Sequence, residues 1–286
     1  MNEKKKLYKV LVGGASCHGG DLRWSLPKRE GETWMPGEWH EVEGDLERCS
    51  NGLHLTSDPA RWWKPNCEIF LVEAEDFDGD EEEDAKVVAR RVRLLRQLSD
   101  EELIDLRIFR SGQHQATGDK AYVASDSASV RAWDSASVEA WGSASVRASG
   151  SASVRAWDSA SVEAWGSASV EAWGSASVRA SGSASVRAWG SASVEASGSA
   201  SVEAWGSASV RAWDSASVVA AYAVTVMVHR GRPQVSLYAA AVLVDWRRPF
   251  GAAPVVKITH GERPAEEFEK LRAEKAETKT KKDGAR

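Results

Sequence analysis

The chain has 286 residues, enough for two ordinary domains, and a formal net charge of −5 at pH 7. Its repeat arginines alternate with glutamates instead of forming a basic stripe, so neither nucleic acid nor an anionic membrane is expected as a partner. The apolar run at 7–12 is too short for a signal peptide, and no later run approaches a membrane span. We expect a cytoplasmic protein, or one in a virus particle assembled there.

Residues 1–110 do not repeat, and their pattern predicts a small α+β head domain. A turn is expected at 13–20 and a solvated acidic loop at 79–84. A cap at Ser57-Asp58-Pro59 predicts one short helix, and Ser99-Asp-Glu-Glu predicts a second helical turn. The expected strands are 7–12, 37–44, 49–56, 67–75 and 86–98.

The three cysteines, Cys17, Cys49 and Cys67, form no CxxC pair and are odd in number, so we expect reduced thiols. Cys and His are good zinc ligands, which makes a site with His18 and His54 conceivable. The spacing matches no zinc signature. No metal ion and no cofactor are therefore predicted.

The stretch from Ser127 to Tyr222 dominates the chain, because an octad restarts every eight residues from Ser127 through Ser215, twelve times in all. Ala, Val and Ala occupy its second, fourth and sixth places and alternate with polar residues, which predicts a short strand with one small apolar face. Gly or Asp in the eighth place, followed by Ser, predicts a corner. Such a fixed period indicates a solenoid whose coils bury their apolar faces by stacking.

The fifth-place charges indicate the length of one coil. In a parallel solenoid, equivalent residues of successive coils lie about 4.8 Å apart, where opposite charges attract. With two octads per coil, eight of the nine vertical pairs are opposite, and only Arg131 and Arg147 are alike. With three octads per coil, only three of eight are opposite. We therefore predict a mainly β fold, a parallel two-sided β-solenoid of 16-residue coils.

The same spacing sorts the seventh-place residues into two columns. One mixes Trp and Ser, and the other is an unbroken tryptophan ladder, the predicted binding surface for a protein or other ligand. Stacked rings could instead serve only to cover the corners, and both interpretations stay open. The ladder comprises Trp141, Trp157, Trp173, Trp189 and Trp205.

The solenoid is assigned to residues 111–222, capping strands to 223–262, and a charged helix with a disordered tail to 263–286. The expected outward places of the last strands are apolar, which predicts an oligomer interface, most simply a dimer about a two-fold axis. Alternatively, Trp246, Phe250 and a strand at 254–259 fold back and cover this end within one chain. The predicted interface residues are Val219, Met227, Val235 and Leu243.

Two resemblances accompany this pattern. The segments LYK (7–9), SCHGG (16–20), GEWHEVEG (37–44) and CSNGLHLTSDP (49–59) resemble an uncharacterised domain of phage and prophage proteins, often followed by short Ala/Ser/Gly/Thr-rich repeats. This resemblance covers about 110 residues and implies no known activity. The octads resemble the flat 16-residue coils of bacterial ice-nucleation proteins, but carry Ser-Ala-Ser beside charges and Trp instead of outward Thr-x-Thr rows.

The sequence thus favours a non-enzymatic structural or interaction protein, a rigid solenoid that presents the ladder and self-associates. One alternative is a small enzyme head on a solenoid stem. Residues 7–9, 52–63 and 68–75 are similar to the strand order around the nicotinamide pocket of ADP-ribosyltransferase-like folds, which would place Tyr8, His54 and Thr56 at a cleft; no catalytic Glu is evident. An ice-binding surface is a further alternative.

Overall fold

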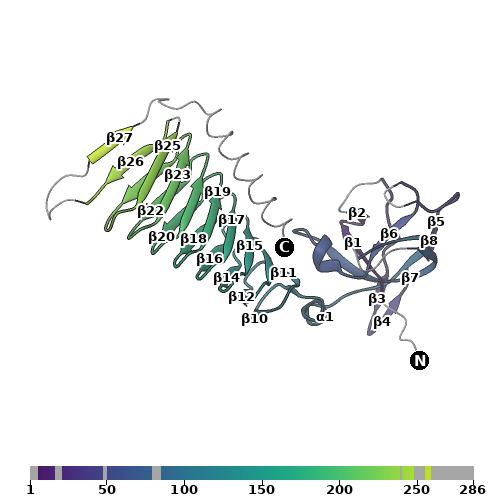
Figure 1. Cartoon of the computed structure of the whole chain (residues 1–286). Coiled ribbons are helices and arrows are strands. Elements are labelled where there is room, and N and C mark those ends of the chain that lie inside the picture. Colours follow the sequence, from purple (N-terminus) through teal and green to yellow (C-terminus); the bar gives the residue numbers. More distant parts are fainter. Residues whose placement is uncertain are drawn as a thin grey trace, which may run out of the picture. The chain divides into compact units, whose positions relative to one another are not determined.

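The computed structural model describes residues 6–16, 21–47, 50–78, 85–238, 240–247 and 255–258 (Figure 1). The chain divides into two compact units. The first comprises Met1–Phe109 with Ala121–Val123, and the second comprises Arg110–Lys120 with Ala124–Arg286. Within the described ranges, no helix is long and apolar enough to cross a membrane.

Four antiparallel strands close a small barrel in the first unit. They are β1 (Tyr8–Val12), β6 (Leu53–Thr56), β7 (Glu68–Asp78) and β8 (Lys86–Gln97). β1 pairs with β6 and β7, and both of these pair with β8, so the circle closes. Leu11, Val92 and Leu94 are completely buried in the interior. The strands predicted around these segments are confirmed.

Short elements surround the barrel. Helical structure in the described part of this unit is limited to η1 (Pro59–Trp62) and the six-residue α1 (Asp100–Asp105), so the head is more β-rich than the predicted α+β domain. The β3–β4 hairpin, which turns at Gly31 with φ 63°, was not predicted. The acidic loop at 79–84 lies outside the described residues. The remaining strands around the barrel are β2 (Ala15–Ser16), β3 (Lys28–Glu30), β4 (Thr33–Met35) and β5 (His40–Glu41).

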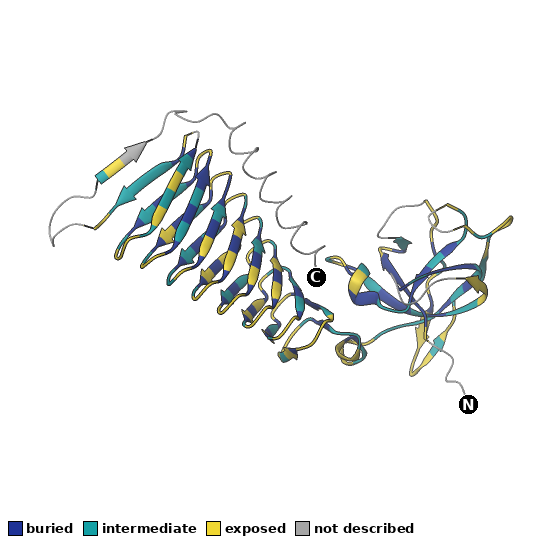
Figure 2. Cartoon of the chain, in the orientation of Figure 1, coloured by how far each residue is buried: buried dark blue, intermediate teal, exposed yellow. Residues whose placement is uncertain are grey.

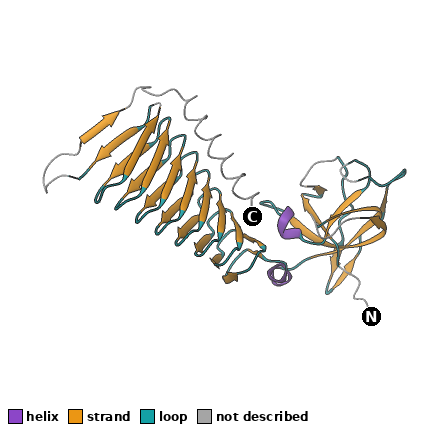
Figure 3. Cartoon of the chain, in the orientation of Figure 1, coloured by secondary structure: helices purple, strands orange, loops and turns teal. Residues whose placement is uncertain are grey.

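Two parallel sheets form the solenoid (Figure 3). One contains β10 (Gln113–Ala116), β12 (Ser129–Ala132), β14 (Ser145–Ala148), β16 (Ser161–Ala164), β18 (Ser177–Ala180), β20 (Ser193–Ala196), β22 (Ser209–Ala212), β24 (Thr225–Val228) and β26 (Val242–Asp245), with β27 (Val255–Ile258) added antiparallel. The other contains β9 (Ile108–Phe109), β11 (Ala121–Ala124), β13 (Ser137–Ala140), β15 (Ser153–Ala156), β17 (Ser169–Ala172), β19 (Ser185–Ala188), β21 (Ser201–Ala204), β23 (Ser217–Ala221) and β25 (Gln234–Tyr238).

Strand pairing confirms the 16-residue coil. Ser129 pairs with Ser145, and Ser145 pairs with Ser161. The solenoid begins before Asp119, as predicted, because β10 already pairs with β12 in the same register. Inside, Ala168 is fully buried and Val170 is 1% exposed, whereas Ser and the charged residues of the octads are partly or fully exposed. Figure 2 shows buried and exposed positions alternating along the solenoid strands. The expected inner and outer faces are therefore confirmed.

The corners explain the choice of Gly or Asp in the eighth place. Gly182 has φ 67°, and a Cβ there would lie 3.1 Å from the backbone N of Gly166 one coil earlier. Asp158 adopts φ 57°, in the left-handed region where Gly is easiest and Asn and Asp are tolerated. Its Oδ2 accepts a hydrogen bond from the N–H of Gly142 at 3.4 Å, so the side chain provides a partner for a backbone amide in the corner one coil earlier.

The register shifts by one residue in the connection before β25. Ser217 pairs with Gln234, 17 residues later, and Val218 therefore pairs with Val235. Since β26 keeps the shift, Val226 pairs with Leu243. The prediction that Val235 and Leu243 continue the outward column was wrong, because one extra residue at 229–233 moves each to the inward position.

Candidate functional site

Backbone hydrogen bonds set the vertical spacing of the tryptophan ladder. Each ladder Trp follows the last Ala of a strand, and its N–H donates to an Ala of the coil below. The N–H of Trp157 thus lies 2.9 Å from the carbonyl oxygen of Ala140, and that of Trp173 lies 2.9 Å from Ala156. The ladder therefore rises in step with the sheets, by about 4.8 Å per coil.

The structure brings all five predicted ladder residues together in one stack. The ring centroids of Trp141 and Trp157 are 4.0 Å apart, and the next three steps measure 5.0–5.1 Å. Adjacent planes differ by only 6–10°. Each inner ring is thus covered on both faces, so a partner would meet mainly ring edges, which carry the positive end of the ring quadrupole.

The C-terminal end of the ladder is covered from within the chain. Trp205 is 6% exposed, whereas the other four rings are half-buried. Tyr238 and Ala221 pack with Trp205 in one buried cluster, and Val219 packs against it. Val219, a predicted interface residue, therefore contributes partly to this intramolecular cap.

Charge columns run along the outer face of both sheets. Arg155 bridges Glu139 below and Glu171 above, with N–O distances of 3.5 and 3.4 Å. Burial raises the pKa of Glu139, and Arg155 opposes this shift. Exposed pairs contribute roughly 0.2–1 kcal/mol each, so the columns fix the register more than they stabilise the fold. The other bridges join Arg147–Glu163, Arg179–Glu195, Arg187–Glu171, Arg187–Glu203 and Arg211–Glu195.

The charge columns end where the predicted interface begins. Met227 occupies the outward place above Arg211, and Val219 occupies the one above Glu203. Val235 and Leu243 are half-buried in inward register on the last described coil. β27 pairs with β26, so the predicted strand at 254–259 folds back on one sheet. Phe250 and the predicted charged helix and tail at 263–286 lie outside the described residues.

The residues of the enzyme alternative have structural partners. Tyr8 pairs with Thr56 across β1 and β6 and is 7% exposed. The carbonyl oxygen of His54 accepts a hydrogen bond from Lys9 Nζ at 2.8 Å. Burial lowers the pKa of the His54 imidazole, and Lys86 and Lys9 lower it further. These contacts join neighbouring strands of the barrel. Of the zinc candidates, Cys67 is buried, and Cys17, His18 and Cys49 lie outside the described residues.

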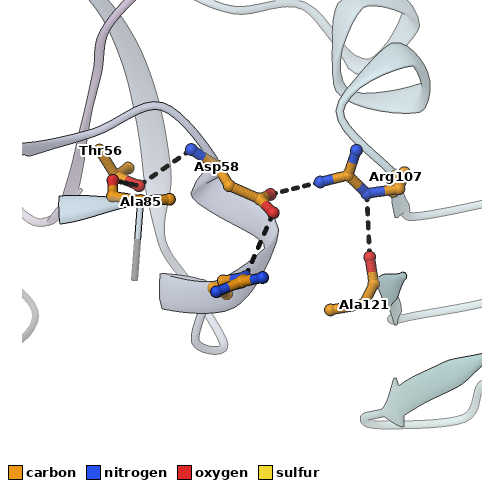
Figure 4. Close-up of polar contacts among 6 residues, drawn as sticks. Thr56, Asp58, Ala85, Arg107 and Ala121 are labelled. Carbon is orange, nitrogen blue, oxygen red and sulfur yellow. Dashed lines mark hydrogen bonds and ion pairs between the residues drawn. The ribbon is translucent and has the colours of Figure 1, made fainter. Parts of the chain in front are cut away.

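The Asp58 side chain joins two segments of the first unit and makes no hydrogen bond to the backbone of η1 (Figure 4). Its carboxylate binds the guanidinium of Arg107 and lies 3.5 Å from that of Arg61. Arg107 also donates from Nε to the carbonyl oxygen of Ala121 at 3.0 Å. The predicted short helix is confirmed, because η1 begins at Pro59 with Asp58 at its N-cap; the Asp58 side chain makes no capping hydrogen bond, since ion pairs occupy its carboxylate. Thr56 Oγ1 accepts from the Asp58 N–H and donates to Ala85.

Barrel and solenoid together define a mainly β repeat protein with a stacked tryptophan ladder. Residues 5–106 match the model of a family described as a domain of unknown function, DUF7666. No curated protein and no solved structure matches the chain. The family description names no process, so an association with phage stays a prediction.

Proposed function

We propose that this protein is a non-enzymatic structural or interaction protein, in which the solenoid presents the tryptophan ladder and self-associates near its C-terminal end. Regular backbone pairing from β10 to β26 favours a rigid scaffold. A virion-associated or cytoplasmic scaffold is compatible with this role.

One observation carries the self-association. Where β22 still carries Arg211 outward, the next three strands carry a row of apolar residues, Met227, Val244 and Val256, in direct register. Met227 and Val244 are half-buried, and Val256 is 55% exposed. Residues in register share one face of a sheet, so the three side chains form a continuous strip.

An exposed apolar strip at the end of a sheet is the kind of surface that proteins cover. A second copy of the chain supplies an identical strip, and a two-fold axis would bring the two together, as in most homo-oligomers. β27 covers the hydrogen-bonding edge of β26 but adds Val256 to the strip. Side-chain burial across the outer face, more than strand addition, would therefore drive the association.

Light scattering of the full chain tests the proposal. We expect the wild type to be oligomeric at tens of micromolar and Met227→Glu to be monomeric, because the carboxylate would be buried in an apolar interface. Ser177→Glu is the matched control, since Ser177 is exposed in the middle of the same sheet, on β18. A monomeric wild type, or an oligomer unaffected by Met227→Glu, would refute self-association through this strip.

A further inference from the structure

A hollow lies beside the second seventh-place column, along β16, β18, β20 and β22. Its volume is about 420 Å³, within the range of roughly 300–1,000 Å³ typical of small-molecule sites. Trp165 and Trp213 lie in its lining, with Ser181 and Ser197 between them in the column. The other lining residues are Glu163, Arg179, Ala180, Glu195 and Ala196.

The two serines occupy places that hold rings in the ladder. Trp165 and Trp213 are 48 residues apart, which is three coils or about 14 Å of rise. Over a span of the same length, three coils, the ladder from Trp141 to Trp189 holds four stacked rings. The second column has rings only at the two ends of this span. The missing volume therefore has the thickness of two flat rings.

Both flanking rings are suited to stacking on a ligand. Trp165 is 41% exposed, although its neighbours in sequence are part of the regular coil. His229 stacks on one face of Trp213, with centroids 5.0 Å apart and planes 14° apart. Trp213 also lines the hollow, so its other face is available to a ligand there.

The charged residues beside the hollow favour an acidic ligand. The lining carries two carboxylates and one guanidinium, those of Glu163, Glu195 and Arg179, but Arg147 and Arg211 just outside it bind Glu163 and Glu195. Three arginines therefore alternate with two glutamates along this part of the column. The Arg179 side chain is 64% exposed, and Glu195 binds both Arg179 and Arg211. Arg179 therefore has guanidinium N–H groups that can turn toward a ligand anion.

We propose that this hollow is a binding site for planar aromatic acids. Their rings stack between Trp165 and Trp213 above Ser181 and Ser197, and the acidic group binds Arg179. Stacking supplies most of the contact, and the charge-assisted hydrogen bond selects an acid over a neutral ring. The site lies on the middle coils and does not depend on the apolar strip at the C-terminal end.

Calorimetric titration of the full chain with naphthalene-2-sulfonate tests the site. We expect binding by the wild type and loss of binding in the double variant Ser181→Trp/Ser197→Trp, whose own indoles would fill the hollow. Ser149→Trp is the matched control, because it adds the same ring to the same column outside the lining residues, and it should bind like the wild type. Arg179→Gln should weaken binding about tenfold for the sulfonate but leave binding of neutral naphthalene-2-carboxamide unchanged.

Three results would overturn the proposal. These are no binding by the wild type, undiminished binding by the double variant, or an equal loss in Ser149→Trp. If the double variant fails to fold, Trp165→Ala replaces it, and undiminished binding by that variant is equally decisive. Dissociation of a wild-type oligomer by the double variant would assign the hollow to side chains of a second copy and would also overturn the proposal.

Discussion

Tyr238 packs with Trp205 in one buried cluster although the two residues are 33 positions apart. Two coils of 16 residues would span only 32, so the extra residue before β25 is what aligns Tyr238 with the ladder column. Ala221 lies between them in the column, and its small side chain leaves room for Trp205 and Tyr238 to pack in the same cluster. The ladder thus ends in a buried aromatic residue and not in an open ring.

Removing this cap should destabilise the C-terminal coils. We expect Tyr238→Ala to lower the free energy of unfolding by about 3 kcal/mol, as for other large-to-small changes at buried aromatic residues. Because Trp205 would become exposed, the tryptophan emission should also shift to longer wavelength. Urea unfolding followed by fluorescence measures both effects. Tyr238→Phe should behave like the wild type in emission, and a blue shift or unchanged emission in Tyr238→Ala would contradict the cap.

Reversal of the charge at Glu171 should weaken its ion pairs with the coils on both sides. Glu171 pairs in register with Arg155 and Arg187 and lies 3.4 Å from each guanidinium. We therefore expect Glu171→Arg to destabilise the solenoid by about 0.2–1 kcal/mol for each pair, and less at high salt. Thermal unfolding at low and high salt provides the test. Glu171→Gln should show a smaller loss, and equal losses for the two variants would argue against like-charge repulsion.

The inner and outer faces should differ sharply in tolerance. Ala168 is completely buried, and Ser167 beside it is exposed. Ala168→Leu should overpack the thin interior and cost about 1–3 kcal/mol or more, whereas Ser167→Leu should change the stability little. Denaturant midpoints of the two variants measure this difference. Equal losses would mean that the assigned faces are wrong.

Acid should loosen α1 of the head. Glu102 completes a capping box with Ser99, and Arg96 binds both of its carboxylate oxygens, at 2.6 and 2.7 Å. These contacts lower the pKa of Glu102 to about 2, chiefly through the Arg96 hydrogen bonds. A lowered carboxylate pKa stabilises the folded state above the ordinary value of 4.5, and this contribution is lost as the pH falls toward 2.

Hydrogen exchange at the Leu103 amide, which donates to the Ser99 carbonyl oxygen at 3.1 Å, reports this loss locally. Its protection, corrected for intrinsic exchange, should fall between pH 4.5 and 2 in the wild type. Glu102→Gln should have lower protection at neutral pH and lack this acid-dependent step. A step of the same size in the variant would assign the acid sensitivity to other groups.

Much of the solenoid could be predicted because the residue pattern that determines it is local and repeats with a fixed period. Ala and Val at alternate places determine the inner face, and the signs at Glu171 and its neighbours determine the coil length. The ladder follows from the same spacing. The Ser181 and Ser197 interruption was also visible in the sequence, but the hollow beside it depends on the side chains around it.

Other features depend on long-range pairing that no local pattern reveals. Closure of the barrel requires β1 to pair with β7, about 60 residues away, and nothing near Tyr8 indicates that partner. The register shift at 229–233 adds one residue in a turn, and one residue is enough to exchange the faces of Val235 and Leu243. Asp58 has the sequence of a helix cap, but Arg107 binds its carboxylate.

The columns of rings and charges exist only if 16 residues make one coil, and a disulfide can test that spacing directly. The Ser191 and Ser207 hydroxyl oxygens, one coil apart, are 3.4 Å from each other. We predict that oxidised Ser191→Cys/Ser207→Cys forms an intrachain disulfide, detected by peptide mass spectrometry, and that Ser191→Cys/Ser215→Cys does not. A disulfide in the second pair and none in the first would indicate a 24-residue coil and contradict the ladder, the hollow and the apolar strip together.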